Sequence, residues 1–230
     1  MTEMSAGITT IAIIGGTGKE CKGLAYRWAK AGYSIIIGSR SVEKAAAAAD
    51  ELSQMLPKGA VIKGLENPAA ASAADLVVLT VPYAAHVSTL ESIRDCLTGK
   101  VLVDVTVPLV PPKVTRVQMP AAGSAAQEAQ SILGAEVQVV SAFQNISYEH
   151  LLHDEKVECD VLVCGGNKAA RGAVLGLVTA AGLTGWDAGP IENSVVAEGL
   201  TSILIGLNKQ FGVQSAGIRI TGVLPASEKE

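Results

Sequence analysis

The chain has 230 residues and a formal net charge of −4; 49% of its residues are hydrophobic, 17% are charged and only 3% are aromatic. The acidic balance and the lack of a Lys/Arg cluster argue against a nucleic-acid partner, and the absence of a bilayer-spanning apolar run or a secretion signal predicts a cytoplasmic protein with no membrane partner. Ala, Val, Ile and Leu must build the core, which suits a parallel sheet covered by helices, and the four scattered cysteines predict neither disulfides nor a metal site.

The first predicted elements are a buried strand and a helix joined by glycines. Residues 11–14 are apolar, Gly16 and Gly18 lie in the turn that follows, and residues 19–31 have helical spacing. Such a corner binds phosphate, because glycine lets the backbone approach an anion that the helix amides face. Cys21 stands where the dinucleotide fingerprint has its third glycine, and glycine turns also occur in proteins that bind no nucleotide. The spacing excludes a Walker-type phosphate loop.

The end of the second predicted strand, residues 34–38, indicates which dinucleotide would bind. NAD-binding domains place an acidic residue here to bond the ribose 2′-hydroxyl. This chain has Ser39 and Arg40, with Lys44 one helical turn further on, so cations and hydroxyls replace the acid. The pattern favours NADP. A surface arginine followed by a serine that caps the next helix is the alternative explanation.

The next elements lead to the clearest strand of the chain. We expect a helix over residues 42–56, a strand over 60–64 and a short helix over 67–74, followed by the continuous apolar strand 75–82. Ligands of open α/β sheets bind outside the carboxyl ends of the strands, which places Thr80, Val81 and Pro82 over the cofactor cleft. The alternative is that these residues only end the strand and lead into the next helix. His86 falls in a helix predicted for residues 83–97. With no acidic or hydroxyl partner near it in sequence, we expect an exposed or capping imidazole rather than a proton relay.

A proline-rich segment and an amide-rich strand end follow. After a strand over 100–106, residues 107–122 contain four of the nine prolines and predict an ordered loop that serves as a lid or a dimer arm. A helix over 124–133 and a strand over 137–142 come next. Phe143, Gln144 and Asn145 leave that strand together and suit a flat heteroaromatic ligand, because amides donate and accept hydrogen bonds; a capped turn is the alternative.

The rest of the chain predicts a second, smaller α/β unit. A strand over 159–166, a helix over 168–181 and a strand near 184–188 precede a helix over 193–211 that is apolar on more than one face. That last helix is buried either in the monomer or between subunits. The fold class is therefore α/β, a Rossmann-type doubly wound parallel sheet with a small C-terminal α/β domain. We place the domains at 8–153 and 154–230.

No catalytic set stands out at the expected strand ends. Ser-His-Asp, paired carboxylates and a metal cluster are not evident, and His150 and His153 lack a third ligand. Hydride transfer between two bound heterocycles needs orientation and exclusion of water and little else, because the cofactors carry the chemistry. We therefore predict no catalytic acid or base.

Eight short segments of the chain form a recognisable set of motifs: Ile14 to Gly18, Lys22 to Ala25, Gly38 to Arg40, Leu79 to Pro82, Ser141 to Asn145, Val163 to Gly165, Asp187 to Pro190 and Gly217 to Ile220. Together these motifs resemble those of the NADPH-dependent reductases of coenzyme F420. The resemblance implies a homodimer that binds NADP and the deazaflavin F420 in a cleft between two domains. It assigns Thr17, Ser39, Arg40 and Lys44 to NADP, and Ala142 to Asn145 to the wall that meets the deazaflavin.

Two departures from the family pattern bear on these expectations. Cys21 replaces the third glycine, and Gln144 stands where members of the family often carry His. An NADPH reductase of another acceptor, such as a flavin, an imine or a metal chelate, shares the glycine turn and the Gly-Ser-Arg corner. A non-catalytic NADP-sensing module that binds a partner through its last helix is the second alternative.

Overall fold

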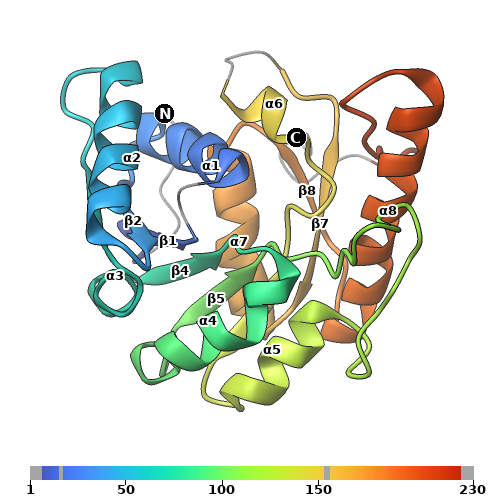
Figure 1. Cartoon of the computed structure of the whole chain (residues 1–230), viewed down its shortest axis with the longest axis horizontal. Helices are drawn as coiled ribbons and strands as arrows, with labels where there is room; N and C mark the ends of the chain where they lie inside the picture. Colours follow the sequence, from blue (N-terminus) through green and yellow to red (C-terminus); the bar gives the residue numbers. More distant parts are fainter. Residues whose placement is uncertain (1–6, 16–17, 153–155, 224–230) are drawn as a thin grey trace.

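The computed structural model describes residues 7–15, 18–152 and 156–223. Within them, eight strands form one sheet of order β3-β2-β1-β4-β5-β6-β7-β8 (Figure 1). The strands are β1 (Thr10–Ile14), β2 (Ser34–Ser39), β3 (Ile62–Glu66), β4 (Leu76–Leu79), β5 (Val101–Asp104), β6 (Gln138–Ser141), β7 (Asp160–Gly165) and β8 (Thr184–Asp187).

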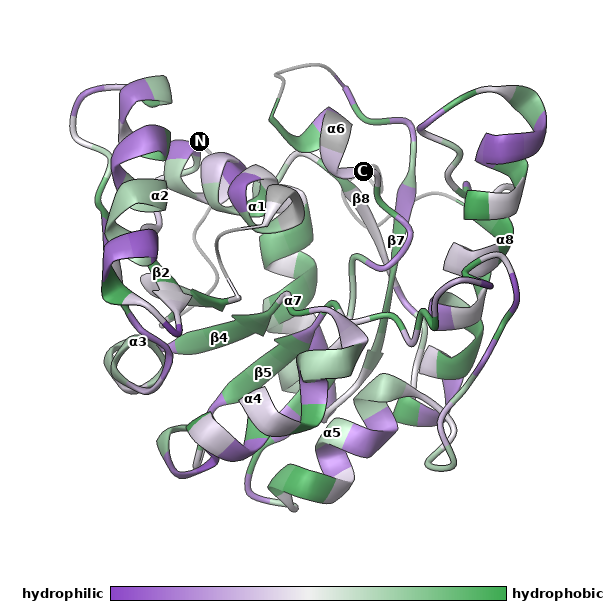
Figure 2. Cartoon of the chain, in the orientation of Figure 1, coloured by the Kyte–Doolittle hydropathy of each residue, from purple (hydrophilic) through white to green (hydrophobic). Residues whose placement is uncertain are grey.

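The first six strands all run parallel, so their carboxyl ends meet at one edge of the sheet. The apolar residues of β1 lie between β2 and β4, and all four residues of β4 are buried, as the unbroken apolar runs predict (Figure 2). β7 then pairs antiparallel with β6, and β8 runs parallel to β7. The strands of the predicted C-terminal domain therefore extend the same sheet.

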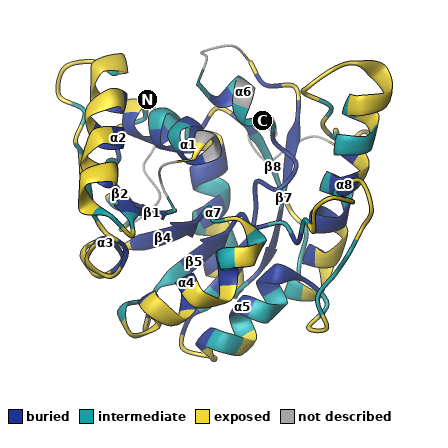
Figure 3. Ribbon diagram, in the orientation of Figure 1, coloured by how far each residue is buried: buried dark blue, intermediate teal, exposed yellow. Residues whose placement is uncertain are grey.

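Helices cover both faces of this sheet, and each face has its own buried cluster (Figure 3). One face carries α1 (Lys19–Lys30), α2 (Val42–Met55) and α7 (Lys168–Ala180), and the other carries α3 (Asn67–Ala73), α4 (His86–Ile93) and α5 (Ala125–Leu133). The remaining helices are α6 (Tyr148–Leu151), α8 (Ser194–Phe211) and the short 3-10 turns η1 (Tyr83–Ala85), η2 (Arg94–Cys96) and η3 (Ile191–Asn193). The doubly wound α/β prediction is confirmed.

Most predicted elements are present, with small shifts at their ends. The strand expected over 60–64 lies at 62–66, and the strand expected over 75–82 keeps only residues 76–79. The single helix expected over 83–97 is an α-helix flanked by 3-10 turns, which are common at helix ends.

Helix α8 buries several polar side chains and exposes several large apolar ones. Its buried residues include Ser194, Glu198 and Ser202, whereas Ile203 and Phe211 are 51% and 66% exposed. The proline-rich segment also packs against α8, where the Ser202 hydroxyl donates to the Arg116 carbonyl at 3.3 Å. Among the described residues, no helix combines the length and the apolar character that a membrane crossing requires.

Candidate functional site

The parallel topology brings the predicted site residues to one edge of the sheet. Gly18 follows β1, Ser39 ends β2, Thr80 follows β4 and Ala142 follows β6. Thr80 is fixed by its hydroxyl, which donates to the Ile14 carbonyl at 3.0 Å and so joins the ends of β1 and β4. Gly16 and Thr17 lie outside the described residues. The other predicted residues are spread along this edge from the β2 end to the β6 end.

The glycine corner leaves the start of α1 open. Gly18 is exposed and forms the N-cap of α1 without a side-chain cap, and a Cβ added there would meet no atom within 4 Å. Gly15 makes the opposite kind of contact: a Cβ there would lie 2.6 Å from Cγ1 of Val81. Gly15 is therefore closely packed against the end of β4, whereas Gly18 is exposed at the start of α1, where the helix dipole favours an anion.

The end of β2 is followed by an exposed cation, Arg40. Arg40 is exposed, and no described residue forms an ion pair with it. Ser41 caps α2, with its hydroxyl accepting from the Lys44 amide at 3.3 Å, as the capping explanation predicted. The Lys44 side chain is exposed in the first turn of α2. Ser41 and not Arg40 makes this cap, so the guanidinium takes no part in it.

The segment after β6 is buried, and its amides bond to the protein. Gln144 donates to the Asp104 carbonyl at 2.7 Å and to the Ser141 hydroxyl at 2.9 Å. Asn145 donates to the Ala197 carbonyl of α8 at 2.9 Å. Phe143 adopts a positive φ of 73°, and its ring meets that of Trp28 edge-on with centroids 5.7 Å apart. These side chains fix the path of the segment, since a non-glycine residue in this conformation needs support from its surroundings.

His86 is the residue that sequence reasoning placed wrongly. Its side chain is fully buried rather than exposed, with Nε2 2.8 Å from an Asp104 carboxylate oxygen and Nδ1 3.1 Å from a Glu128 carboxylate oxygen. Burial opposes the charged imidazole, but the hydrogen bonds and charges of Asp104 and then Glu128 outweigh it and raise the pKa of His86. These partners could not be recognised from the sequence, because they lie 18 and 42 residues further along the chain.

A second buried acid, Glu198, joins α8 to the start of α5. Its two carboxylate oxygens accept from the amides of Ala125 and Ala126 at 2.7 and 3.1 Å. Beside them the hydroxyls of Ser124 and Ser194 are 2.7 Å apart. Burial is the main cause that raises the pKa of Glu198 to about 8, and the charge of Asp104 adds to it. Among the described residues no group of His, Cys, Asp and Glu has a metal-binding arrangement.

Glu198 should make the stability of the protein depend on pH. Its pKa of about 8 in the fold exceeds the ordinary value of 4.5, so the fold holds a proton that the unfolded chain releases. The free energy of unfolding should therefore fall as pH rises from 4.5 to about 8, by up to ~1.4 kcal/mol per pH unit from this group. Urea unfolding of wild type and Glu198→Gln across this range should show a shallower slope for the variant. The exposed Glu192→Gln should keep the wild-type slope, and equal slopes for all three proteins would contradict the assignment.

Comparison with known proteins identifies relatives that are NADP oxidoreductases. The family model described as NADP oxidoreductase, coenzyme F420-dependent, matches residues 10–108. The F420-dependent NADP reductase of Methanocaldococcus jannaschii is 42% identical over 221 residues, covering 93% of this chain and 98% of the relative. That of Methanothermobacter thermautotrophicus is 41% identical, covering 96% and 98%.

A solved structure supports the same grouping. A candidate F420-dependent NADP reductase from Arthrobacter sp. FB24 superposes with a TM-score of 0.77 at 25% identity, over 94% of this chain and 100% of that one. The close relatives align over nearly their whole length and not only over the glycine corner. The chain therefore belongs to the family of coenzyme F420-dependent NADP oxidoreductases.

Proposed function

We propose that the protein transfers a hydride reversibly between NADP(H) and the deazaflavin coenzyme F420, directly from one bound cofactor to the other. The observation that carries the proposal is the 42% identity to an F420-dependent NADP reductase of which 98% is aligned. Nearly the whole of that relative, including any segment large enough to form a cofactor site, therefore has a counterpart in this chain. The proposal includes a cytoplasmic location, as the sequence predicts.

The residues at the sheet edge fit NADP. The open start of α1 at Gly18 suits a pyrophosphate. The Arg40 guanidinium, which has no ion-pair partner in the described part of the chain, suits a 2′-phosphate, with Lys44 and Ser39 close to it in the chain. We propose that Gly16, Thr17 and Gly18 complete the phosphate site and that Thr80, Val81 and Pro82 line the nicotinamide side. The cofactor atoms would then lie along the carboxyl ends of β2, β1 and β4.

The segment from Ala142 to Asn145 is our proposed wall for the deazaflavin. Because Gln144 and Asn145 are bonded to protein groups, their role would be to hold the backbone of this wall in place. When bound, NADPH supplies a hydride from C4 of its nicotinamide, and F420 accepts it at C5. The protein's own part is to orient the two rings and exclude water, without a catalytic acid or base.

A direct assay tests the proposal. Incubation with NADPH and F420 should bleach the deazaflavin absorbance, and reduced F420 with NADP should restore it. Absence of bleaching would refute F420 as the hydride acceptor. A parallel screen with a flavin, an imine and a metal chelate distinguishes a reductase of another acceptor, and NADPH binding without any reduction would identify an NADP-sensing module.

We also propose that the protein is a homodimer in which residues 154–230 close the cleft over the NADP-binding part, residues 8–153. The support is the outer stripe of α8. Its exposed apolar residues recur on one side of the helix at Val196, Ile203, Leu207 and Phe211, while other residues of the helix, among them Glu198, are already buried against the same chain. A contiguous apolar stripe of this kind marks an association surface. A second copy is the simplest partner, because it supplies the same stripe.

Replacing Ile203 by Asp should separate the subunits. The charge would be buried against an apolar stripe, so light scattering after gel filtration should give the chain mass of 23.5 kDa for the variant and twice that for wild type. Val61→Asp is the matched control, because Val61 is also exposed, at 56%, but precedes β3, which lies at the opposite edge of the sheet from the strand β7 that α8 contacts. A wild-type mass of one chain would contradict the dimer.

A further inference from the structure

The His86 side chain lies between two carboxylates. Nε2 faces Asp104 at 2.8 Å and Nδ1 faces Glu128 at 3.1 Å. A carboxylate accepts hydrogen bonds, and a neutral imidazole has only one N–H to donate. Both carboxylates receive a hydrogen bond from the ring only when both ring nitrogens carry hydrogen. The geometry therefore favours the imidazolium form. We call these three residues the His86 clamp.

The His86 clamp joins three strand ends of the proposed cofactor site. His86 begins α4, which the 3-10 turn η1 joins to Thr80, Val81 and Pro82 at the end of β4. Asp104 ends β5, where its second carboxylate oxygen accepts from the Thr106 amide at 3.0 Å. The Asp104 carbonyl accepts from Gln144, which anchors the segment after β6. One imidazolium therefore connects the end of β4 with β5 and, through Asp104, with β6.

The surroundings of His86 contain a limited set of titratable groups. Asp104 comes from β5, Glu128 from α5 and Tyr83 from η1, the last stacked on the imidazole with ring centroids 5.9 Å apart. The Tyr83 hydroxyl donates to Glu128 at 3.3 Å. Glu198 of α8 interacts electrostatically with Asp104 and His86, and its pKa is raised to about 8, chiefly by burial. Of the three clamp side chains, Glu128 is 23% exposed while His86 and Asp104 are 0% and 1% exposed. Glu128 therefore forms the end that faces solvent.

We propose that His86 is a positioning residue: as the imidazolium it locks the ends of β4 and β5 in the arrangement that binds NADP, and loss of its proton loosens them and lowers the affinity. The physical reason is that a neutral ring presents a lone pair to one of the two carboxylates. That contact turns from a charge-assisted hydrogen bond into a repulsion within a buried site. The inference rests on the proposed binding of NADP.

Two measurements over the same pH range test the role of His86. The chain contains three histidines, so the His86 ring proton can be assigned in NMR spectra by comparison with His86→Gln. NADPH affinity is measured by fluorescence from about pH 7 to about pH 10, where the cofactor's own phosphate is fully ionised. The dissociation constant should rise about ten-fold or more with the same midpoint as the NMR titration of His86.

Glu128→Gln is the decisive variant. The amide keeps an acceptor for His86 but removes one negative charge, so both midpoints should move together to lower pH. Glu198→Gln is the control for the neighbouring acid, and it should shift the affinity profile only as far as it shifts the His86 titration. Three results would overturn the inference. The NADPH affinity could stay constant while His86 titrates, or His86 could keep its proton throughout the pH range. In the third, the affinity profile of Glu128→Gln would not follow the NMR midpoint of that variant. A wild-type protein that binds no NADPH at any pH would instead refute the proposed function.

Discussion

Replacing Arg40 by Ala should weaken NADPH binding about 10- to 100-fold and leave NADH binding almost unchanged. The change removes a charge-assisted contact to the 2′-phosphate worth roughly 1.5–3 kcal/mol, and NADH has no such phosphate. The structure favours this role because Arg40 directly follows β2, is exposed, and has no ion-pair partner among the described residues. Titration of each cofactor by fluorescence, with wild type alongside, gives the comparison.

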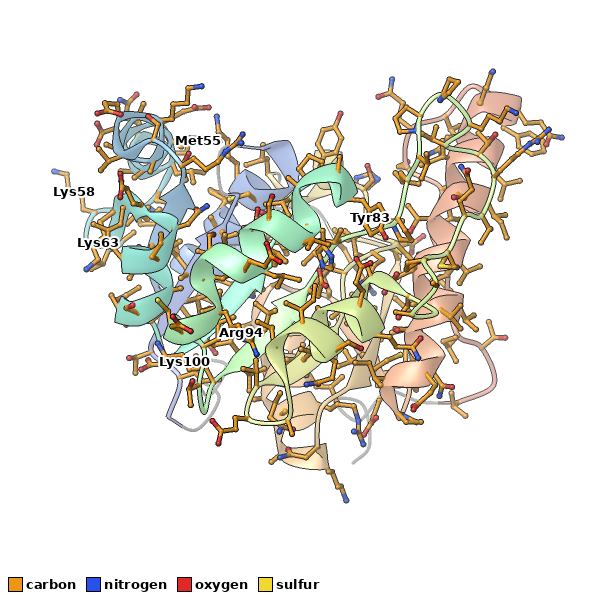
Figure 4. The ribbon with its side chains drawn as sticks, turned by 60° about the horizontal axis from the view of Figure 1, so that its bottom comes forward. Met55, Lys58, Lys63, Tyr83, Arg94 and Lys100 are labelled. Atoms are coloured by element: carbon orange, nitrogen blue, oxygen red, sulfur yellow. The ribbon has the colours of Figure 1, made fainter. Side chains whose placement is uncertain are left out.

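A second arginine provides the control for this experiment. Arg94 is also exposed but lies at the far end of α4 from Tyr83, away from the carboxyl ends of the strands (Figure 4). Arg94→Ala removes the same charge from the molecule without touching the β2 end, so its affinities for NADPH and NADH should match those of wild type. An equal loss for both cofactors in Arg40→Ala would show that Arg40 supports the fold or the ribose and does not read the phosphate.

The order of elements was predictable because each element is encoded locally. Continuous apolar runs marked β1, β2 and β4, and Ser124 marked the start of α5, where its hydroxyl accepts from the Gln127 amide at 3.0 Å. The direction of β7 was not encoded in this way. An apolar run reads the same in a parallel and in an antiparallel strand, so only the packing of the chain decides that β7 lies antiparallel to β6.

The His86 clamp could not be found by spacing. The register of the sheet sets Asp104 beside Leu79, and the packing of α5 against α4 brings Glu128 to the other side of the ring. A search for partners close in sequence to His86 cannot find Glu128 and Asp104, because they lie 42 and 18 residues away. One signal was present: Asp104 ends a strand that is otherwise apolar, and a buried acid requires a partner.

The amides after β6 show a different limit. Sequence composition marked Phe143 to Asn145 as a group at a strand end, and the structure places all three there. Whether an amide faces a ligand or the protein depends on its neighbours. Thr201 of α8, whose hydroxyl donates to the Gln144 carbonyl at 2.8 Å, lies 57 residues away in the chain. This contact holds the backbone of the segment, and the side chains of Gln144 and Asn145 are bonded to Asp104 and Ala197, so our proposal gives these amides the role of holding the wall and not of contacting the deazaflavin.

Replacing Gly15 by Ala should lower both the stability of the fold and its affinity for NADPH. Gly15 has a φ of +82°, and an added Cβ would lie 2.6 Å from Cγ1 of Val81 and 3.2 Å from the Thr80 carbonyl oxygen. The left-handed backbone costs roughly 1–2 kcal/mol for alanine, and forcing a methyl into a packed site adds roughly 1–3 kcal/mol. The clash falls on the end of β4, so the proposed nicotinamide side of the site should move away from the glycine turn.

Gly99→Ala separates the two causes of that loss. Gly99 has a similar φ of +75°, but a Cβ there meets no atom within 4 Å, so this variant carries the backbone strain without the clash. Urea unfolding should show a loss of roughly 1–2 kcal/mol for Gly99→Ala and a clearly larger loss for Gly15→Ala, and only the latter should bind NADPH more weakly, by about ten-fold or more. If the two variants lost equal stability and Gly15→Ala bound NADPH as wild type does, the contact between the glycine turn and β4 would have no part in holding the cofactor. The glycine that matters would then be Gly18, whose open position above α1 needs no contact with β4 at all.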